Sequence, residues 1–248
     1  MMGLVFAFLA VALIYASVGF GGGSTYTAIL ALTGAPFQAI PVISLCCNLA
    51  VVSGSLFRFA KAGQLPWREA WPYLVLSIPV AYWMGTLSLA ESSFLLILGI
   101  ALILSAFAMV WPVPQKGHLL KPPGFLTRIG LGGVFGALAG LVGIGGGIFL
   151  APSLYLLKAA TPQHIAATAS LFIAANSLAG LAGHLSRALS LQTVASHWPL
   201  LVAVVVGGQI GSWLTIKVMP QRWLKWATAG LVFYVGLRLL LQLSESSV

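Results

Sequence analysis

The chain has 248 residues, of which 60% are hydrophobic and only 6% are charged. Soluble domains carry roughly 25% charged residues, so this composition excludes a water-soluble globular domain and indicates an integral membrane protein. The net charge of +9 comes from 12 Lys and Arg against 3 Asp and Glu. These cations are scattered at the ends of apolar segments and form no patch, which argues against nucleic-acid binding and is typical of topology signals.

The first predicted helices are short. Apolar segments at about 3–17 and about 24–33 flank a glycine cluster at 19–23. Glycine is a poor residue for a helix interior, so the cluster predicts a break between two helical pieces. At 1.5 Å per residue the pieces are about 22 Å and 15 Å long, and neither spans a hydrocarbon core of about 30 Å.

Longer apolar segments follow, and the whole order then repeats. The first half continues with predicted helices at about 37–60, 69–89 and 92–111. A proline-rich polar linker occupies 112–124. The second half has predicted pieces at about 126–141 and 148–157 around the glycines at 143–147, then helices at about 163–185, 194–218 and 222–243. We therefore predict an all-α polytopic membrane protein with transmembrane repeats at 1–111 and 125–248, joined by a cytoplasmic linker.

The two halves match at small and proline residues in the same order. The matching pairs are Pro36 with Pro162, Ser44 with Ser170, Gly54 with Gly180, and Gly85 with Gly211. Each half thus has a pair of short pieces and three long helices. If each short pair forms a re-entrant hairpin, the three remaining spans are an odd number, and the repeats are inverted relative to each other.

The basic residues favour re-entrant hairpins over full crossings. With hairpins, ten of the twelve basic residues fall on the linker side, and only Arg187 and Arg238 fall on the other. With full crossings, Arg187 and Arg238 join the linker side while Lys158, Lys217, Arg222 and Lys225 leave it, and the split weakens to 8:4. The positive-inside rule prefers the stronger asymmetry. We therefore expect a multi-pass protein of the plasma membrane with both termini outside.

The glycine clusters predict an anion-binding site. Irregular backbone at membrane depth must be buried in protein or line a wet cavity. Each short helix after a break begins with amides that lack intrahelical partners and carry partial positive charge. Ser24 and Thr25 can cap the first of these helices and donate hydroxyls. Two such N-termini could bind a small anion without lysine or arginine. The alternative is that the glycines only allow close helix packing.

Polar residues inside the long helices are further candidates. Ser44 and Asn48 share one helix face, because they stand four residues apart. Two interpretations are open: these side chains line a transport pathway, or they only form hydrogen bonds between helices. Arg58 and His184 stand at equivalent places near the ends of two helices, with Arg187 beyond. These three residues anchor at the interface or gather anions at two pathway mouths.

The scarcity of carboxylates limits the mechanism. The chain has no Asp, and its glutamates are Glu69, Glu91 and Glu245. We therefore expect no carboxylate proton relay, no catalytic set, no metal site and no cofactor. An anion leaving an inside-negative cell gains ~2.3 kcal/mol per charge per 100 mV, so its export needs no coupling ion.

The two glycine clusters also carry a family resemblance. Gly19-Phe20-Gly21-Gly22-Gly23 and Gly143-Ile144-Gly145-Gly146-Gly147 are each followed by a proline-led helix with Ser44 or with Thr168-Ala169-Ser170. This pattern resembles the sulfite exporter TauE/SafE family over nearly the whole chain. The resemblance implies a permease for sulfite, organosulfonates or related sulfur oxyanions. By position it implies these lining residues: Gly21, Gly22, Gly23, Ser24, Thr25, Ser44, Asn48, Gly145, Gly146, Gly147, Thr168, Ser170 and Asn176.

The second glycine cluster departs from the first, and the sequence allows more than one function. Ile148 and Phe149 stand where the first copy has Ser24 and Thr25, so the predicted site is asymmetric. Export by alternating access is the leading hypothesis, with a small anion and the lipid bilayer as partners. The alternatives are uptake of thiosulfate or another small anion, with Cys46 or Cys47 in contact with it, and a non-transporting assembly subunit. The sequence leaves a homo-oligomer open.

Overall fold

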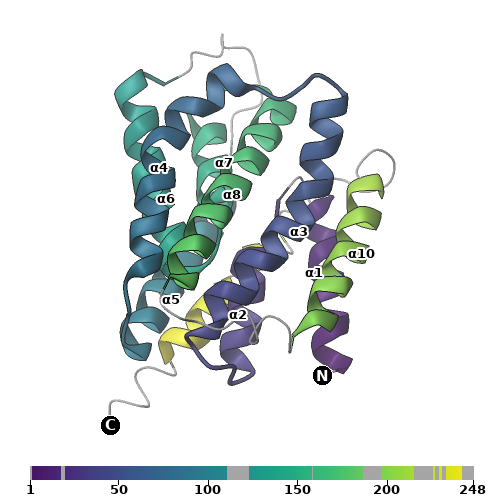
Figure 1. The fold of residues 1–248 in the computed structure, drawn as a ribbon, viewed down its shortest axis with the longest axis vertical. Helices are drawn as coiled ribbons and strands as arrows, with labels where there is room; N and C mark the ends of the chain where they lie inside the picture. The colour runs from purple at the N-terminus through teal and green to yellow at the C-terminus, as the bar shows by residue number, and fades with distance from the viewer. Residues whose placement is uncertain are drawn as a thin grey trace.

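The fold is a bundle of helices of unequal length, described from a computed structural model (Figure 1). The structure describes residues 2–17, 20–110, 123–157, 159–186, 197–214, 226, 229–230 and 233–241. Within these residues every regular element is a helix, as predicted. The helices are α1 (Met2–Ala16), α2 (Gly23–Leu32), α3 (Ala39–Lys61), α4 (Trp67–Thr86), α5 (Glu91–Val110), α6 (Phe125–Val142), α7 (Gly147–Leu156), α8 (Pro162–Leu185) and α10 (Trp198–Leu214).

Most predicted helices agree with the structure to within two or three residues. The structure has both predicted helix breaks, one between α1 and α2 and the other between α6 and α7. Four of the described helices are long and apolar enough to cross a membrane: Ala39–Lys61, Glu91–Ala108, Phe125–Val142 and Gln163–Leu185. Of the predicted linker at 112–124 only the last two residues are described, and of the predicted helix at 222–243 only part is.

The two pairs of helices around the glycine clusters, α1 with α2 and α6 with α7, run in opposite senses. Helix α1 starts at the lower end of the bundle in Figure 1 and ends near its middle, and α2 returns to the lower end. Helix α6 starts at the upper end, and α7 returns there (Figure 1). Each pair is therefore a hairpin that turns back inside the bundle, and both turns contain one of the glycine clusters.

Helices of one half pack against helices of the other through glycine. Gly132, Gly136 and Gly140 of α6 have no space for a Cβ atom, because the α4 backbone lies against them. The α4 residues that they face are, in the same order, Tyr73, Ser77 and Ala81. Small residues at this four-residue spacing let two helix backbones approach closely. Helices α4 and α6 thus run parallel, in contact along most of their length.

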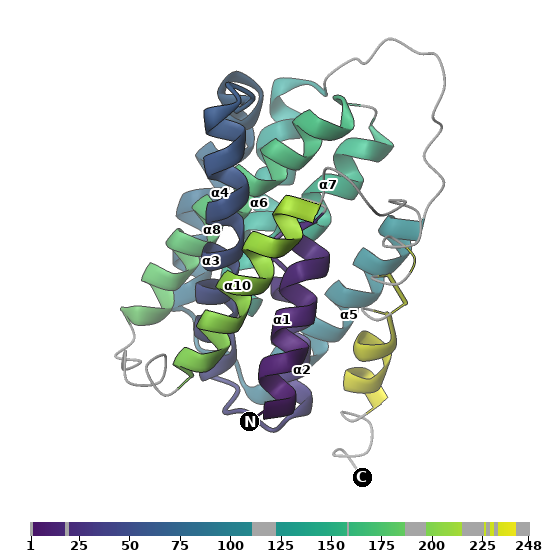
Figure 2. The ribbon, with the colours of Figure 1, turned by 90° about the vertical axis from the view of Figure 1, so that its right-hand side faces the viewer.

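A second parallel pair, α1 and α10, uses the same kind of packing. Gly207 and Gly211 of α10 lie against the backbone of Leu9 and Leu13 in α1. Figure 2 shows the two helices side by side. Both helix pairs therefore join the first helix of one half to the helix of the other half that carries the Trp-Pro motif, at Trp71-Pro72 or Trp198-Pro199.

The core and the outer surface are both apolar. Phe8 and Tyr26, both fully buried, stack with ring centroids 4.7 Å apart and fix α2 against α1. Large side chains are also exposed, with Trp83 and Trp213 each 69% exposed and Leu104 62% exposed. An apolar outer surface of this kind suits hydrocarbon and not water, which agrees with a membrane protein.

Candidate functional site

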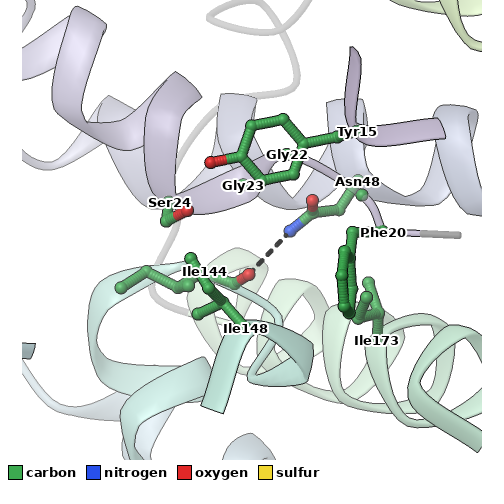
Figure 3. A pocket seen from close by; sticks show the side chains of 10 residues that line it. Tyr15, Phe20, Gly22, Gly23, Ser24, Asn48, Ile144, Ile148 and Ile173 are labelled. Atoms are coloured by element: carbon green, nitrogen blue, oxygen red, sulfur yellow. Dashed lines mark hydrogen bonds between the residues drawn. The ribbon is translucent and has the colours of Figure 1, made fainter. Parts of the chain in front are cut away.

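A pocket lies between the two glycine clusters, where the hairpins meet inside the bundle (Figure 3). About 200 Å³ of empty space, part of it open to the outside, lies among the atoms that line it. Residues from α1, from both hairpin turns, and from α2, α3, α7 and α8 line it: Tyr15, Phe20, Gly21, Gly22, Gly23, Ser24, Asn48, Ile144, Ile148 and Ile173. The pocket is thus built by both halves of the chain.

Each short helix begins at a glycine in the left-handed region. Gly22 is the N-cap of α2 with φ 83°, and Gly146 is the N-cap of α7 with φ 77°. The carbonyl oxygen of each glycine accepts hydrogen bonds from the amides three and four residues later in the chain. In α2 these are the amides of Thr25 and Tyr26. The amides at the start of an α-helix have no acceptor four residues back, and the two directly after the N-cap residue find none within the helix. In α2 these are the amides of Gly23 and Ser24, and both residues line the pocket.

The expected capping role of Ser24 and Thr25 is wrong. The N-cap of α2 is Gly22, with no side-chain cap, and Ser24 and Thr25 lie inside the first turn. The Thr25 hydroxyl instead pairs with the hydroxyl of Tyr15 at 2.7 Å, which ties α2 to α1. A left-handed N-cap needs glycine and leaves no hydroxyl to do the capping.

Asn48 joins the two hairpin turns. Its side-chain Nδ2 donates to the backbone carbonyl of Ile144 at 3.1 Å (Figure 3). A Cβ at Gly23 or Gly21 would overlap the Asn48 amide, and a Cβ at Gly145 would lie 2.7 Å from Asn48 Nδ2. These glycines therefore leave the space that the asparagine fills. Its Oδ1 is buried and has no hydrogen-bond partner.

Hydroxyl groups fix the start of α2 on α3. Ser44 Oγ donates to the carbonyl of Gly23 at 2.9 Å, and Thr27 Oγ1 donates to the same carbonyl at 2.8 Å. Thr27 Oγ1 also lies 2.9 Å from Ser44 Oγ, so its single proton is shared between the carbonyl and the serine oxygen. Ser44 is fully buried and is not part of the pocket lining, so it holds the glycine backbone in position from behind.

The second half contributes an apolar wall. Ile148 takes the place that Ser24 has in the first half, and Ile173 and Phe20 lie near it (Figure 3). The polar residues expected from the second half do not line the pocket. Thr168, Ser170 and Asn176 instead donate to carbonyls of their own helix, those of His164, Ala166 and Phe172, at 2.8–2.9 Å.

Comparison with known proteins identifies the family. The model of the sulfite exporter TauE/SafE family matches residues 4–239. The chain belongs to this family. It is also 34% identical over 243 residues to the probable membrane transporter protein y4hK of Sinorhizobium fredii. The aligned residues cover 96% of this chain and 98% of that protein. No solved structure matches the chain. Membership of the TauE/SafE family and the similarity to this relative support membrane transport as its function.

Two of the expected pathway-mouth residues of this TauE/SafE protein, Arg58 and His184, are absent from the lining of the pocket. Arg58 donates through Nη2 to the carbonyl and to Oε1 of Gln209 in α10, both at 3.3 Å. His184 is buried near the other end of the bundle, where Nε2 lies 2.8 Å from the carbonyl of Gly140. A second pocket there includes His184 and Gln38 in its lining. Arg187, like Gly19 of the first glycine cluster, lies outside the described residues.

The remaining expected residues are absent from the lining of the pocket. Gly146 lies against Phe172, and Gly147 lies against Ile173. Cys47 is fully buried, Cys46 is half-buried, and neither is in the lining of the two pockets described above.

The sequence reasoning missed half of the pocket lining. The missed residues are Tyr15, Phe20, Ile144, Ile148 and Ile173. A tyrosine in the last turn of an otherwise apolar helix is a detectable signal, because a phenol in a membrane needs a polar partner. The isoleucines carry no such signal, since they look like every other core residue of this chain.

Proposed function

We propose that this protein is a permease for a small sulfur oxyanion, such as sulfite or an organosulfonate, and that the pocket between the glycine turns is its binding site. The observation that supports this most is the set of donors at the pocket, the first amides of α2 and the Ser24 hydroxyl, with no basic side chain in the lining. Free amides at a helix N-terminus favour an anion. The lack of a lysine or arginine lets the anion leave again.

The halves are proposed to be inverted repeats that work by alternating access. The opposite senses of the two hairpins and the reciprocal packing of α4 on α6 and α10 on α1 support this arrangement. The repeats are 1–111 and 125–248, and the linker at 112–124 is cytoplasmic. Movement of one repeat against the other would open the pocket to each side in turn.

Both termini are then expected outside the plasma membrane. A single cysteine added before Met1, and another added after Val248, should react with a membrane-impermeant maleimide on intact cells. The controls are Cys46→Ala and Cys47→Ala in the background and a cysteine in the linker at Gln115, which should react only after the membrane is opened. Labelling of Gln115→Cys on intact cells, with the terminal cysteines protected, would show the reverse topology.

Export is the direction that the charges favour. An anion gains ~2.3 kcal/mol per charge per 100 mV when it leaves an inside-negative cell. The scarcity of carboxylates removes the usual anionic sodium ligands and proton carriers, so a downhill route without a coupling ion is the simplest one.

The test is anion flux by the purified protein in liposomes under an imposed potential. We expect flux of sulfite or a small sulfonate above that of protein-free liposomes, with a rate that rises when the receiving side is made positive. Sulfate and thiosulfate serve as competing substrates. Flux of none of these anions, with correctly folded protein in the membrane, would overturn the proposal.

A further inference from the structure

The side chain of Asn48 presents an unused acceptor to the pocket. Its nitrogen donates to the carbonyl of Ile144, and a carbonyl can only accept, so this contact fixes which end of the amide is oxygen. The oxygen Oδ1 lies beside Gly21 and Gly23 and has no partner, although the residue is fully buried. An unpaired buried acceptor is costly unless a donor reaches it. The pocket therefore calls for a ligand with a donor as well as negative charge.

The same pocket suits one negative charge and not two. None of the described residues that line it is basic, so hydroxyls and backbone amides are the groups there that can compensate an anion. Three apolar side chains, Phe20, Ile148 and Ile173, make up the opposite wall. Removing an ion from water costs free energy that grows with the square of its charge, so a dianion is penalised much more than a monoanion.

Resting on the proposed function, we propose that the pocket binds a hydroxyl-bearing monoanion, hydrogensulfite, in preference to the sulfite dianion. The hydroxyl of the substrate donates to Asn48 Oδ1. Its charged oxygens accept from the amides of Gly23 and Ser24 and from the Ser24 hydroxyl. The proton then crosses the membrane on the substrate, and the chain needs no carboxylate to carry it.

The decisive test is the pH dependence of flux through the wild-type protein in liposomes. Total sulfite is held constant, the pH is equal on both sides, and the series crosses the second pKa of sulfurous acid. Flux above that of protein-free liposomes should fall about tenfold per pH unit on the alkaline side, as the monoanion disappears. Methanesulfonate, a monoanion without a titrating hydroxyl, should be slower and show no such fall.

Two matched variants test whether flux depends on Asn48 in particular or on any buried asparagine of the chain. Asn48→Leu keeps the size of the side chain but removes both its free acceptor and its bond to Ile144, and we expect it to lower sulfite flux more than tenfold. Asn176→Leu removes a similar buried amide outside the pocket and should keep the wild-type pH profile. Sulfite flux that is constant or rises with pH would overturn the preference while leaving the permease intact. Flux of no anion at any pH would overturn both proposals.

Discussion

Replacing Gly136 with leucine should destabilise the protein by about 3 kcal/mol or more, at the top of the range for overpacked sites. A Cβ at this position would lie 2.7 Å from the backbone Cα and carbonyl oxygen of Ser77, so α6 has to move away from α4. Backbone atoms cannot rotate aside as a side chain can. The contact runs from Gly132 to Gly140, and the whole interface between the halves would open. Thermal unfolding in detergent measures the effect.

The matched control lies in the same helix. Gly130 of α6 has no atom within 4 Å of an added Cβ. Gly130→Leu should leave stability unchanged or raise it by up to about 1 kcal/mol, because leucine is the better helix former. Equal melting temperatures for Gly136→Leu and Gly130→Leu would mean that close contact between α4 and α6 does not hold the halves together.

Replacing Gly145 with alanine should reduce anion flux more than tenfold. Gly145 has φ 79°, which costs an L-residue roughly 1–2 kcal/mol. Its Cβ would also lie 2.7 Å from Asn48 Nδ2 and 3.1 Å from Ser177 Oγ. The alanine therefore displaces the amide that joins the two hairpin turns. Flux by the folded, reconstituted protein is the measurement.

Gly34 isolates the backbone part of that effect. It has φ 72°, close to that of Gly145, but an added Cβ would meet nothing within 4 Å. Gly34→Ala should lose a similar roughly 1–2 kcal/mol of stability and keep its flux. If both variants lose flux alike, backbone strain alone explains the loss and the contact with Asn48 has no special role.

Much of the fold follows from local sequence. The breaks at the glycine clusters, the ten-residue helices α2 and α7, and the long apolar α3 and α8 all come from composition and from glycine's cost in a helix. Half of the pocket lining also follows, since Gly21 to Ser24 and Asn48 stand out as polar or small residues in apolar segments.

The rest depends on contacts between segments far apart in the chain. The bond from Asn48 to Ile144 joins residues 96 positions apart, and no local pattern specifies it. The outcomes for Ser44 and Asn48 illustrate this. They share a helix face as expected, yet Ser44 holds the carbonyl of Gly23 while Asn48 reaches the pocket. Which polar residue lines a site and which supports it is decided by tertiary packing.

The two glycine turns have similar backbones and different surroundings. Both helices start at a left-handed glycine, but Ser24 lines the pocket from the first copy and Ile148 from the second. The free amides at the start of α2 would bind a monoanion. The apolar wall at the second turn adds no further charge, so the monoanion could leave again. The asymmetry is thus part of the proposed mechanism.

The position of the bound anion is the most direct test of the proposed binding site. Selenite, the selenium analogue of sulfite, can be located by anomalous scattering in crystals of the protein. We expect a selenium peak between Asn48, Ser24 and Gly23, and its loss in Gly145→Ala. A peak beside His184 and Gln38 in the second pocket, with none between the glycine turns, would contradict it.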